Sequence, residues 1–367
     1  MQKRFHASAA TIHDDAALRS VLRHTPLPGN VSVTLEREPS FFQGDVDSQR
    51  HDVAVVHDGD SRIIALASRI ERQAWMNNEI QTVAYLGDLR VLPEHRKSSG
   101  RILLEGFRFM RELNAKRTTA ATYTAIFEDN TKAQRVLVGG RAGLPQYVDR
   151  GRLFCPALLV RRQMRQPKAA RCELRQATTS DLPSITTFLN NSFRHRDLAP
   201  IHSVEDFIAA TRWPGLRAED FIVAWDGNRL IGCVALWDLR ACRQVRVHAY
   251  QGWMRRLHGV LSFCMKSIGW HSLPRPGEFL PAAFASFLAA QDNDLAVARV
   301  LLNQARYHAS QRGIGFLFTC LHECDPLLPA LDKWPAIHST GRLYEVVYNG
   351  EPRLSSTSLP HVEAALL

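Results

Sequence analysis

The sequence has 367 residues, 45% of them hydrophobic and 22% charged, with a formal net charge of +10. This balance excludes an intrinsically disordered chain, and the length favours two domains. The positive charge should attract anions such as nucleic acid, anionic lipid or a phosphorylated cofactor. No stretch approaches the roughly 18 apolar residues of a membrane span, so we expect no membrane partner.

The cysteines indicate the compartment. They number seven and are irregularly spaced, which is typical of a reducing environment. The N-terminal residues lead into no apolar signal segment, so the sequence predicts a cytoplasmic protein. Cys320 and Cys324 are spaced like one of the two ligand pairs of a structural metal site, but no second pair lies at ligand spacing. We therefore expect no metal.

The first half of the chain begins with a short strand and an acid-containing helix start at Asp14 and Asp15. An Asp-Gly pair between two apolar runs then predicts a β-hairpin over 52–67. The alternation that follows is typical of an α/β fold. It predicts a strand over 80–92, a helix over 99–115, a strand over 119–127 and a helix over 130–138.

A polar, basic stretch around Pro167 separates two apolar runs and indicates a domain boundary. We expect an N-terminal domain over 1–162, a linker over 163–171, a C-terminal domain over 172–350 and a tail over 351–367. The second half repeats the elements of the first. It predicts a helix start at 180–183, a hairpin over 221–235, a strand over 283–290, a helix over 294–311 and a strand over 314–319.

One strand, loop and helix of the first half carries the residues of an anion site. The stretch from Asp88 to Arg101 combines the cationic Arg96 and Lys97 with small residues at the helix start. The first amides of a helix point outward without partners and carry the positive end of its dipole. Gly100 leaves room for close approach, so the segment predicts a pyrophosphate site.

This segment resembles motif A of the GCN5-related N-acetyltransferases, in which a strand ending in Val-x-Pro leads into Arg/Gln-x-x-Gly-x-Gly/Ala. Val91, Pro93 and Arg96 match its fixed positions, whereas Ser99 and Arg101 stand where the family has its glycines. The resemblance implies that the strand end binds pantetheine and the loop amides bind pyrophosphate, with acetyl-CoA or another acyl-CoA as cosubstrate. The cofactor-binding residues that it implies are Leu89, Arg90, Val91, Arg96, Lys97, Ser98, Ser99, Gly100, Arg101, Ile102 and Asn130.

A second stretch, Glu128 to Leu137, resembles the Asn-x-x-Ala-x-x-x-Tyr helix of the same family. Asn130 would begin that helix, and an asparagine there also serves simply as an N-cap. Leu137 replaces the tyrosine that protonates the leaving thiolate in many relatives. Tyr85 and Tyr147 are candidates for that acid by residue type alone.

The resemblance implies a fold class of α/β (α+β) type: two such domains in tandem, each a mixed, mostly antiparallel splayed sheet flanked by helices. It also implies direct attack of an amine on a thioester, which needs a base for the ammonium proton. Asp88 is the carboxylate nearest the predicted site, and a pairing with Arg90 or a neighbour is an equally good reading. In the second half, Asp292 and Asp294 at the helix start would repel a pyrophosphate.

The stretch 240–270 mixes arginines with aromatic residues. It is typical of an inserted amphipathic segment that packs between domains, or of a surface for nucleic acid or an acidic substrate.

Three functions fit the sequence: an N-acyltransferase acting on a small amine or a peptide, an acyltransferase that uses aminoacyl-tRNA or an acyl carrier, and a non-catalytic acyl-CoA-binding or regulatory protein. The sequence favours the first, leaves nucleic acid open as a partner and gives no oligomeric state.

Overall fold

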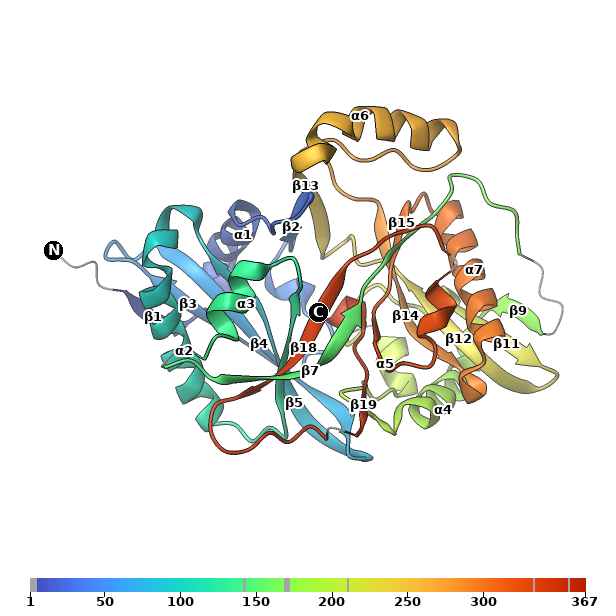
Figure 1. Cartoon of the computed structure of the whole chain (residues 1–367). Helices are drawn as coiled ribbons and strands as arrows, with labels where there is room; N and C mark the ends of the chain where they lie inside the picture. The colour runs from blue at the N-terminus through green and yellow to red at the C-terminus, as the bar shows by residue number, and fades with distance from the viewer. Residues whose placement is uncertain (1–4, 141–142, 168–171, 210, 333, 356) are drawn as a thin grey trace.

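The computed structural model describes residues 5–140, 143–167, 172–209, 211–332, 334–355 and 357–367. Two sheets with helices packed on them form the two halves of the molecule (Figure 1). Each half begins as predicted, with a short strand and a capping box. Thr11 donates its amide to Asp14 over 2.7 Å, and Thr178 donates its amide to Asp181 over the same distance.

Within the described residues the first sheet has eight strands, six of them from the first half of the chain. All neighbouring pairs are antiparallel except β5 and β6. In sheet order the strands are β1 (His6–Ala9), β3 (Arg50–His57), β4 (Ile63–Met76), β5 (Glu79–Val91), β6 (Thr122–Phe127), β18 (Thr340–Val347), β7 (Gln146–Phe154) and β16 (Leu321–His322).

The second sheet has seven strands in the described part of the chain and is likewise mixed, because only β14 and β15 run parallel. In sheet order they are β17 (Ala336–Ile337), β8 (Ala157–Leu159), β15 (Phe316–Phe318), β14 (Ala282–Ala290), β12 (Arg229–Trp237), β11 (Phe221–Asp226) and β9 (Glu173–Gln176). Two smaller ribbons pair β2 (Val31–Glu36) with β13 (Gln244–Tyr250), and β10 (Arg196–Asp197) with β19 (Leu359–Pro360).

The helices follow from amphipathic patterns and local caps. The predicted helix over 99–115 is α2, and Asp294 caps the predicted helix of the second half, α7, by accepting the amides of Ala296 and Val297. The α-helices are α1 (Asp15–His24), α2 (Ser99–Ala115), α3 (Thr131–Leu137), α4 (Leu182–Phe193), α5 (Val204–Ala209), α6 (Gly252–Ser267) and α7 (Leu295–Gln311).

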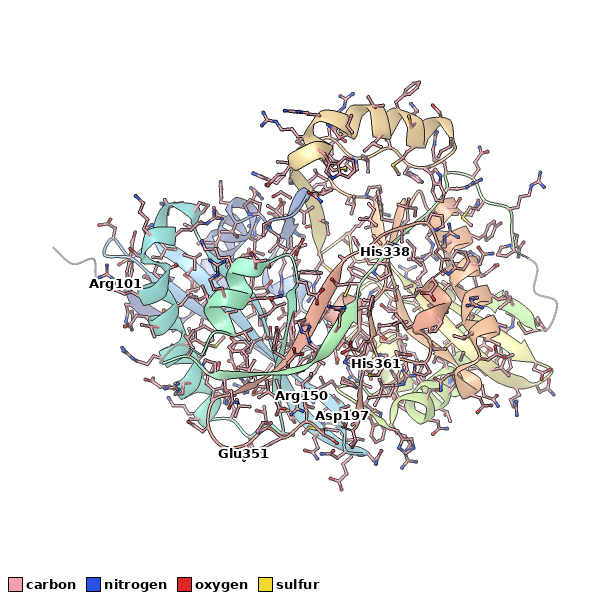
Figure 2. The ribbon with its side chains drawn as sticks, viewed as in Figure 1. Arg101, Arg150, Asp197, His338, Glu351 and His361 are labelled. Atoms are coloured by element: carbon pink, nitrogen blue, oxygen red, sulfur yellow. The ribbon has the colours of Figure 1, made fainter. Side chains whose placement is uncertain are left out.

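The two halves exchange strands, which the predicted linker over 163–171 did not anticipate. β18 comes from the second half but lies between β6 and β7 of the first sheet, and β8 comes from the first half but joins the second sheet. Buried Glu345 anchors β18, because it accepts from Arg150 of β7, which is labelled in Figure 2, over 2.6 Å and from the amide of Arg353 over 2.5 Å. Residues 168–171 of the predicted linker lie outside the described residues.

Candidate functional site

The candidate site is a gap between the parallel strands β5 and β6. In the described structure the two strands pair only at Ala84 with Thr122 and at Tyr85 with Tyr123. A bulge interrupts β5 just beyond this point, since the β4–β5 register shifts there and Asp88 adopts a φ of 52°. The edge of β5 from residue 87 to 91 therefore faces the gap without a neighbouring strand.

Tyr85 closes the paired end of the gap. Its ring packs against the ring of Tyr123, with centroids 5.3 Å apart, and the guanidinium of Arg72 lies 5.6 Å from its centroid. A Cβ on Gly87 would lie 2.8 Å from the Tyr85 ring, so the glycine permits this packing. Burial and the nearby charge of Asp88 raise the pKa of Tyr85. The residue is a buried packing group, which weighs against its predicted role as an acid.

On one face of the sheet, the N-terminus of α2 opens toward solvent. The preceding turn is a 3₁₀ helix, Pro93–Ser98, and the N-cap residue Ser98 makes no side-chain hydrogen bond to the helix amides. The first turn of α2 contains no acidic residue, and a Cβ on Gly100 would meet nothing within 4 Å. This helix end thus combines a positive dipole with free space, as an anion requires.

The structure gathers the predicted phosphate-binding residues at this helix end, with differing exposure. Arg96, Lys97, Gly100 and Arg101 are exposed, whereas the side chain of Ile102 is buried in the core and leaves only its backbone for a ligand. Ser98 and Ser99 are partly buried in the same turn. The guanidinium of Arg101 lies 5.9 Å from the ring centroid of Phe5, at the outer edge of the molecule (Figure 2).

A cavity of about 60 Å³ lies between α2 and the sheet and reaches the gap. Its walls are mainly apolar, and Leu89 of β5, Leu137 of α3 and Tyr147 of β7 contribute to them. Tyr348, just after β18, also lines it, and the Tyr348 hydroxyl is buried without a hydrogen-bond partner in the structure. Burial raises the pKa of both tyrosines, so both hydroxyls stay protonated.

Tyr348 lines the cavity but was not among the predicted residues. Its position in the chain follows the exchanged strand β18, far from the motifs of the first half, and no local pattern marks it. Tyr147 and Leu137 line the same cavity and belong to the same apolar cluster.

On the opposite face of the sheet, five polar side chains form a closed ring around the β5 bulge. Arg37 donates to Asp88 over 2.7 Å and to Asp45 over 3.1 Å. Ser68 donates to Asp88 over 3.0 Å and lies 3.0 Å from Nε2 of His51, whose Nδ1 is 2.6 Å from Oδ1 of Asp45. We call these residues the polar ring. None of them except Asp88 was predicted, because they come from separate strands and loops.

Asp88 is therefore ionised and strongly held. Its burial opposes ionisation, but the charges of Arg37, Arg90 and Arg243 outweigh burial and lower the pKa of Asp88 to about 2. The structure decides the predicted pairing: the carboxylate of Asp88 accepts from Arg37 and Ser68, while Arg90 donates to the carbonyl of Leu89 over 3.0 Å. A carboxylate with so low a pKa is a weak proton acceptor near neutral pH.

The remaining predicted residues have structural contacts of their own. Asn130 caps α3 by accepting the amide of Ala133 over 3.2 Å, which is its simpler predicted role. Val91 pairs with Ala65 across β4 and β5 and packs partly against the core of the first half.

In the second half, the position that corresponds to the β5–β6 gap lies between β14 and β15, and C-terminal residues of the chain occupy it. There β14 and β15 pair only from Ala282 to Phe284, and Phe287 adopts a φ of 55° beyond them. The carboxylate of Glu363 accepts the amide of Phe287 over 2.9 Å, and Leu366 packs in the same core. Asp294 already occupies the helix amides that a phosphate would need.

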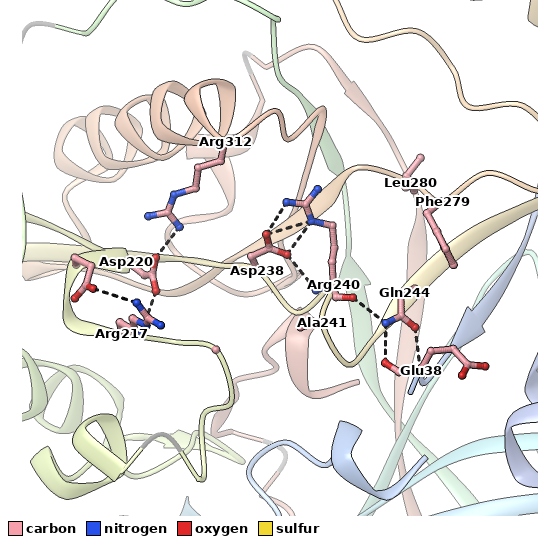
Figure 3. Close-up of a pocket in the computed structure, with 12 residues that line it drawn as sticks. Glu38, Arg217, Asp220, Asp238, Arg240, Ala241, Gln244, Phe279, Leu280 and Arg312 are labelled. Atoms are coloured by element: carbon pink, nitrogen blue, oxygen red, sulfur yellow. Dashed lines mark hydrogen bonds and ion pairs between the residues drawn. The ribbon is translucent and has the colours of Figure 1, made fainter. Parts of the chain in front are cut away.

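A second, open cleft of about 910 Å³ is lined mainly by residues of the second half, together with Glu38 of the first half (Figure 3). Its arginines are paired: Arg312 binds Asp220, and Arg240 binds Asp238, each over 2.6 Å. At its edge Gln244 exchanges two hydrogen bonds with the backbone of Glu38, the residue next to Arg37. The cleft thus reaches the chain neighbour of Arg37, a member of the polar ring.

Three further observations concern the described residues alone. They contain no group of three His, Cys, Asp or Glu side chains placed to hold a metal ion. None of their helices is long and apolar enough to cross a membrane. Cys320 contacts Cys155 with their sulfurs 3.0 Å apart, while Cys324 is exposed.

Solved structures share this fold, although no protein-family model and no curated protein match the sequence. Saccharomyces cerevisiae N-myristoyltransferase with bound myristoyl-CoA has a TM-score of 0.61 at 10% identity, covering 95% of this chain and 84% of its own. A GCN5-related N-acetyltransferase from Sphaerobacter thermophilus has a TM-score of 0.58 at 12% identity, covering 96% and 98%. The glucosamine N-acetyltransferase region of a fungal multi-domain β-N-acetylglucosaminidase has a TM-score of 0.59 at 12% identity, covering 94% of this chain and 38% of that chain. The predicted fold, that of the GCN5-related N-acetyltransferases, is confirmed.

Proposed function

We propose that this protein is an N-acyltransferase that passes an acyl group from acetyl-CoA, or another short acyl-CoA, to an amine across the β5–β6 gap. One observation carries the proposal: the unpaired edge of β5 has an open helix N-terminus on one face and a polar ring on the other. Donor and acceptor can therefore approach one reacting centre from opposite sides.

The donor side fits an acyl-CoA. The backbone of Leu89 to Val91 would bind pantetheine, and the amides of the first α2 turn would bind pyrophosphate, with Arg96 and Lys97 adding charge. Asn130 would act only indirectly, by capping α3 and so placing this helix beside the pantetheine group. The cavity has room for a few water-sized groups, which suits the end of a short acyl chain better than a long one.

The acceptor side fits an amine. Its nitrogen would attack the thioester carbonyl, the C–S bond would break, and the ammonium proton would leave through the polar ring. Asp88 is too weakly basic to take that proton alone, so it would orient the amine while the proton passes through Ser68 to Nε2 of His51. A small amine or a peptide N-terminus could enter through the cleft beside Glu38.

The CoA thiolate that leaves in this reaction needs a proton, and we assign the donation of that proton to the Tyr348 hydroxyl. Tyr348→Phe should lower kcat by about 100-fold with little change in the KM for acyl-CoA, because the ring volume stays and only the donor is lost. Tyr147→Phe, which changes the same cavity, is the matched control. Steady-state thiol release measures both variants, and equal rates for Tyr348→Phe and the wild type would contradict the assignment.

The proposed function is tested with short-, medium- and long-chain acyl-CoA and a panel of amines. A ligand that binds only the native state must raise Tm, so acetyl-CoA should shift the melting temperature. Thiol release with at least one amine should follow. A protein without a Tm shift at millimolar acyl-CoA would refute the donor assignment.

A non-catalytic acyl-CoA-binding protein is the second candidate. Leu137 at the usual tyrosine position and the low basicity of Asp88 favour it. Binding of CoA without thiol release across the whole amine panel would support this candidate over the enzyme. Salt-sensitive binding of tRNA would instead favour an aminoacyl-tRNA donor.

A further inference from the structure

Helix α6 lies at the outside of the molecule (Figure 1) and carries several large apolar side chains that are exposed to solvent. Trp253 is 57% exposed and Phe263 is 72% exposed, and three aliphatic side chains extend the same surface. We call the five residues the α6 ridge: Trp253, Leu257, Val260, Phe263 and Ile268. Exposed large apolar groups gathered on one helix indicate a contact surface, whereas single ones are ordinary.

The ridge is distinct from the face by which α6 is attached. Met254 is buried, and Leu261 and Met265 pack with it against Tyr250 and Val247. Residues 254, 258, 261 and 265 lie on one side of a helical wheel. Residues 253, 257, 260 and 268 lie beside them, and residue 263 lies farther round, nearly opposite the attached side. The apolar arc of α6 is thus wider than its contact with the body, and the remainder is uncovered.

The charged side chains of α6 itself have one sign. α6 contains no acidic residue, and its Arg255, Arg256 and Lys266 are all exposed. Two more exposed arginines lie at its C-terminal end, since the Arg162 amide donates to the carbonyl of Gly269 over 2.8 Å and the Arg161 guanidinium lies 5.2 Å from the Trp270 ring centroid.

We infer that the α6 ridge docks this protein on an anionic phospholipid surface. A convex apolar ridge with aromatic residues and flanking cations is the chemistry of a helix that lies in the plane of the membrane interface. Trp253 and Phe263 would enter the headgroup boundary, and the arginines would contact lipid phosphates. α6 is a 16-residue amphipathic helix, so it would lie on the bilayer and not cross it.

Co-sedimentation with vesicles tests the inference on the full chain. The wild type should bind vesicles of phosphatidylcholine with phosphatidylserine and not bind pure phosphatidylcholine, with binding falling as salt rises. Trp253→Ser with Phe263→Ser should abolish sedimentation. Arg255→Gln with Arg256→Gln should weaken it by about ten-fold or more. Ile208→Ser, which removes a side chain 63% exposed on α5, is the matched control and should bind normally.

Four results would overturn the inference. The wild type could fail to bind anionic vesicles, or the Trp253→Ser, Phe263→Ser protein, verified as folded by its unchanged Tm, could still bind them. Concentration-dependent dimerisation through the ridge without vesicle binding would show that a second copy covers it. Binding of single-stranded RNA through α6 without vesicle binding would show a nucleic-acid surface.

Discussion

Gly100→Glu will abolish CoA binding and leave the protein folded. The new carboxylate would stand in the first turn of α2, where the pyrophosphate would lie. Two unit charges about 4 Å apart repel by about 4 kcal/mol at an intermediate effective dielectric, so we expect Kd to rise at least about 100-fold. Isothermal titration calorimetry with CoA measures this change.

The same substitution is mild for the unliganded fold. A Cβ at Gly100 meets nothing within 4 Å, glutamate is a better helix former than glycine, and an acid favours the helix N-terminus. Tm should therefore stay equal or rise slightly. Gly100→Ala is the control, since it adds a side chain without charge and should retain most CoA affinity. Unchanged CoA affinity in a folded Gly100→Glu protein would remove the phosphate site from α2.

Arg37→Met will strongly destabilise the protein. The substitution keeps the apolar part of the side chain but leaves the carboxylate of Asp88, whose side chain is only 16% exposed, without its main charged partner. Removing one member of a buried ion pair costs about 3–5 kcal/mol. Urea denaturation should show a loss of this size, and Asp88→Asn in the same background should recover part of it. Additive losses in this double-mutant cycle would contradict the coupling between Arg37 and Asp88.

Asp88 also predicts how stability depends on pH. Its folded pKa is lowered from 3.8 to about 2, so its contribution is fully present above the unfolded pKa and is lost as pH falls from about 4 to 2. The difference corresponds to about 2 kcal/mol. The wild type should lose this part of its stability in acid, and Asp88→Asn should show a flatter profile over that window. Identical profiles would mean that Asp88 is not held as the structure shows.

The proposed acyl-CoA side of the site could largely be predicted from the sequence. The helix predicted over 99–115 has those bounds, and Gly100, Arg96 and Lys97 lie at its start. The helix and the place of these residues at its start depend only on nearby sequence. The spacing of apolar residues predicts the helix, and the preceding proline marks where it begins. The pairing of Asp88 was not readable, because Arg37 lies in a loop that only folding brings to the bulge.

The sequence by itself determined the local elements of this protein: the two hairpins, the strand–loop–helix with its open N-terminus, and the acid-capped helix of the second half. Tertiary structure alone decided the exchange of β8 and β18, the closure of the polar ring and the place of Tyr348. Helix caps and hydrophobic periodicity involve residues within one or two turns of each other, so they can be recognised in the local sequence. Strand partners and buried ion pairs are chosen by packing between distant segments, which no local pattern records.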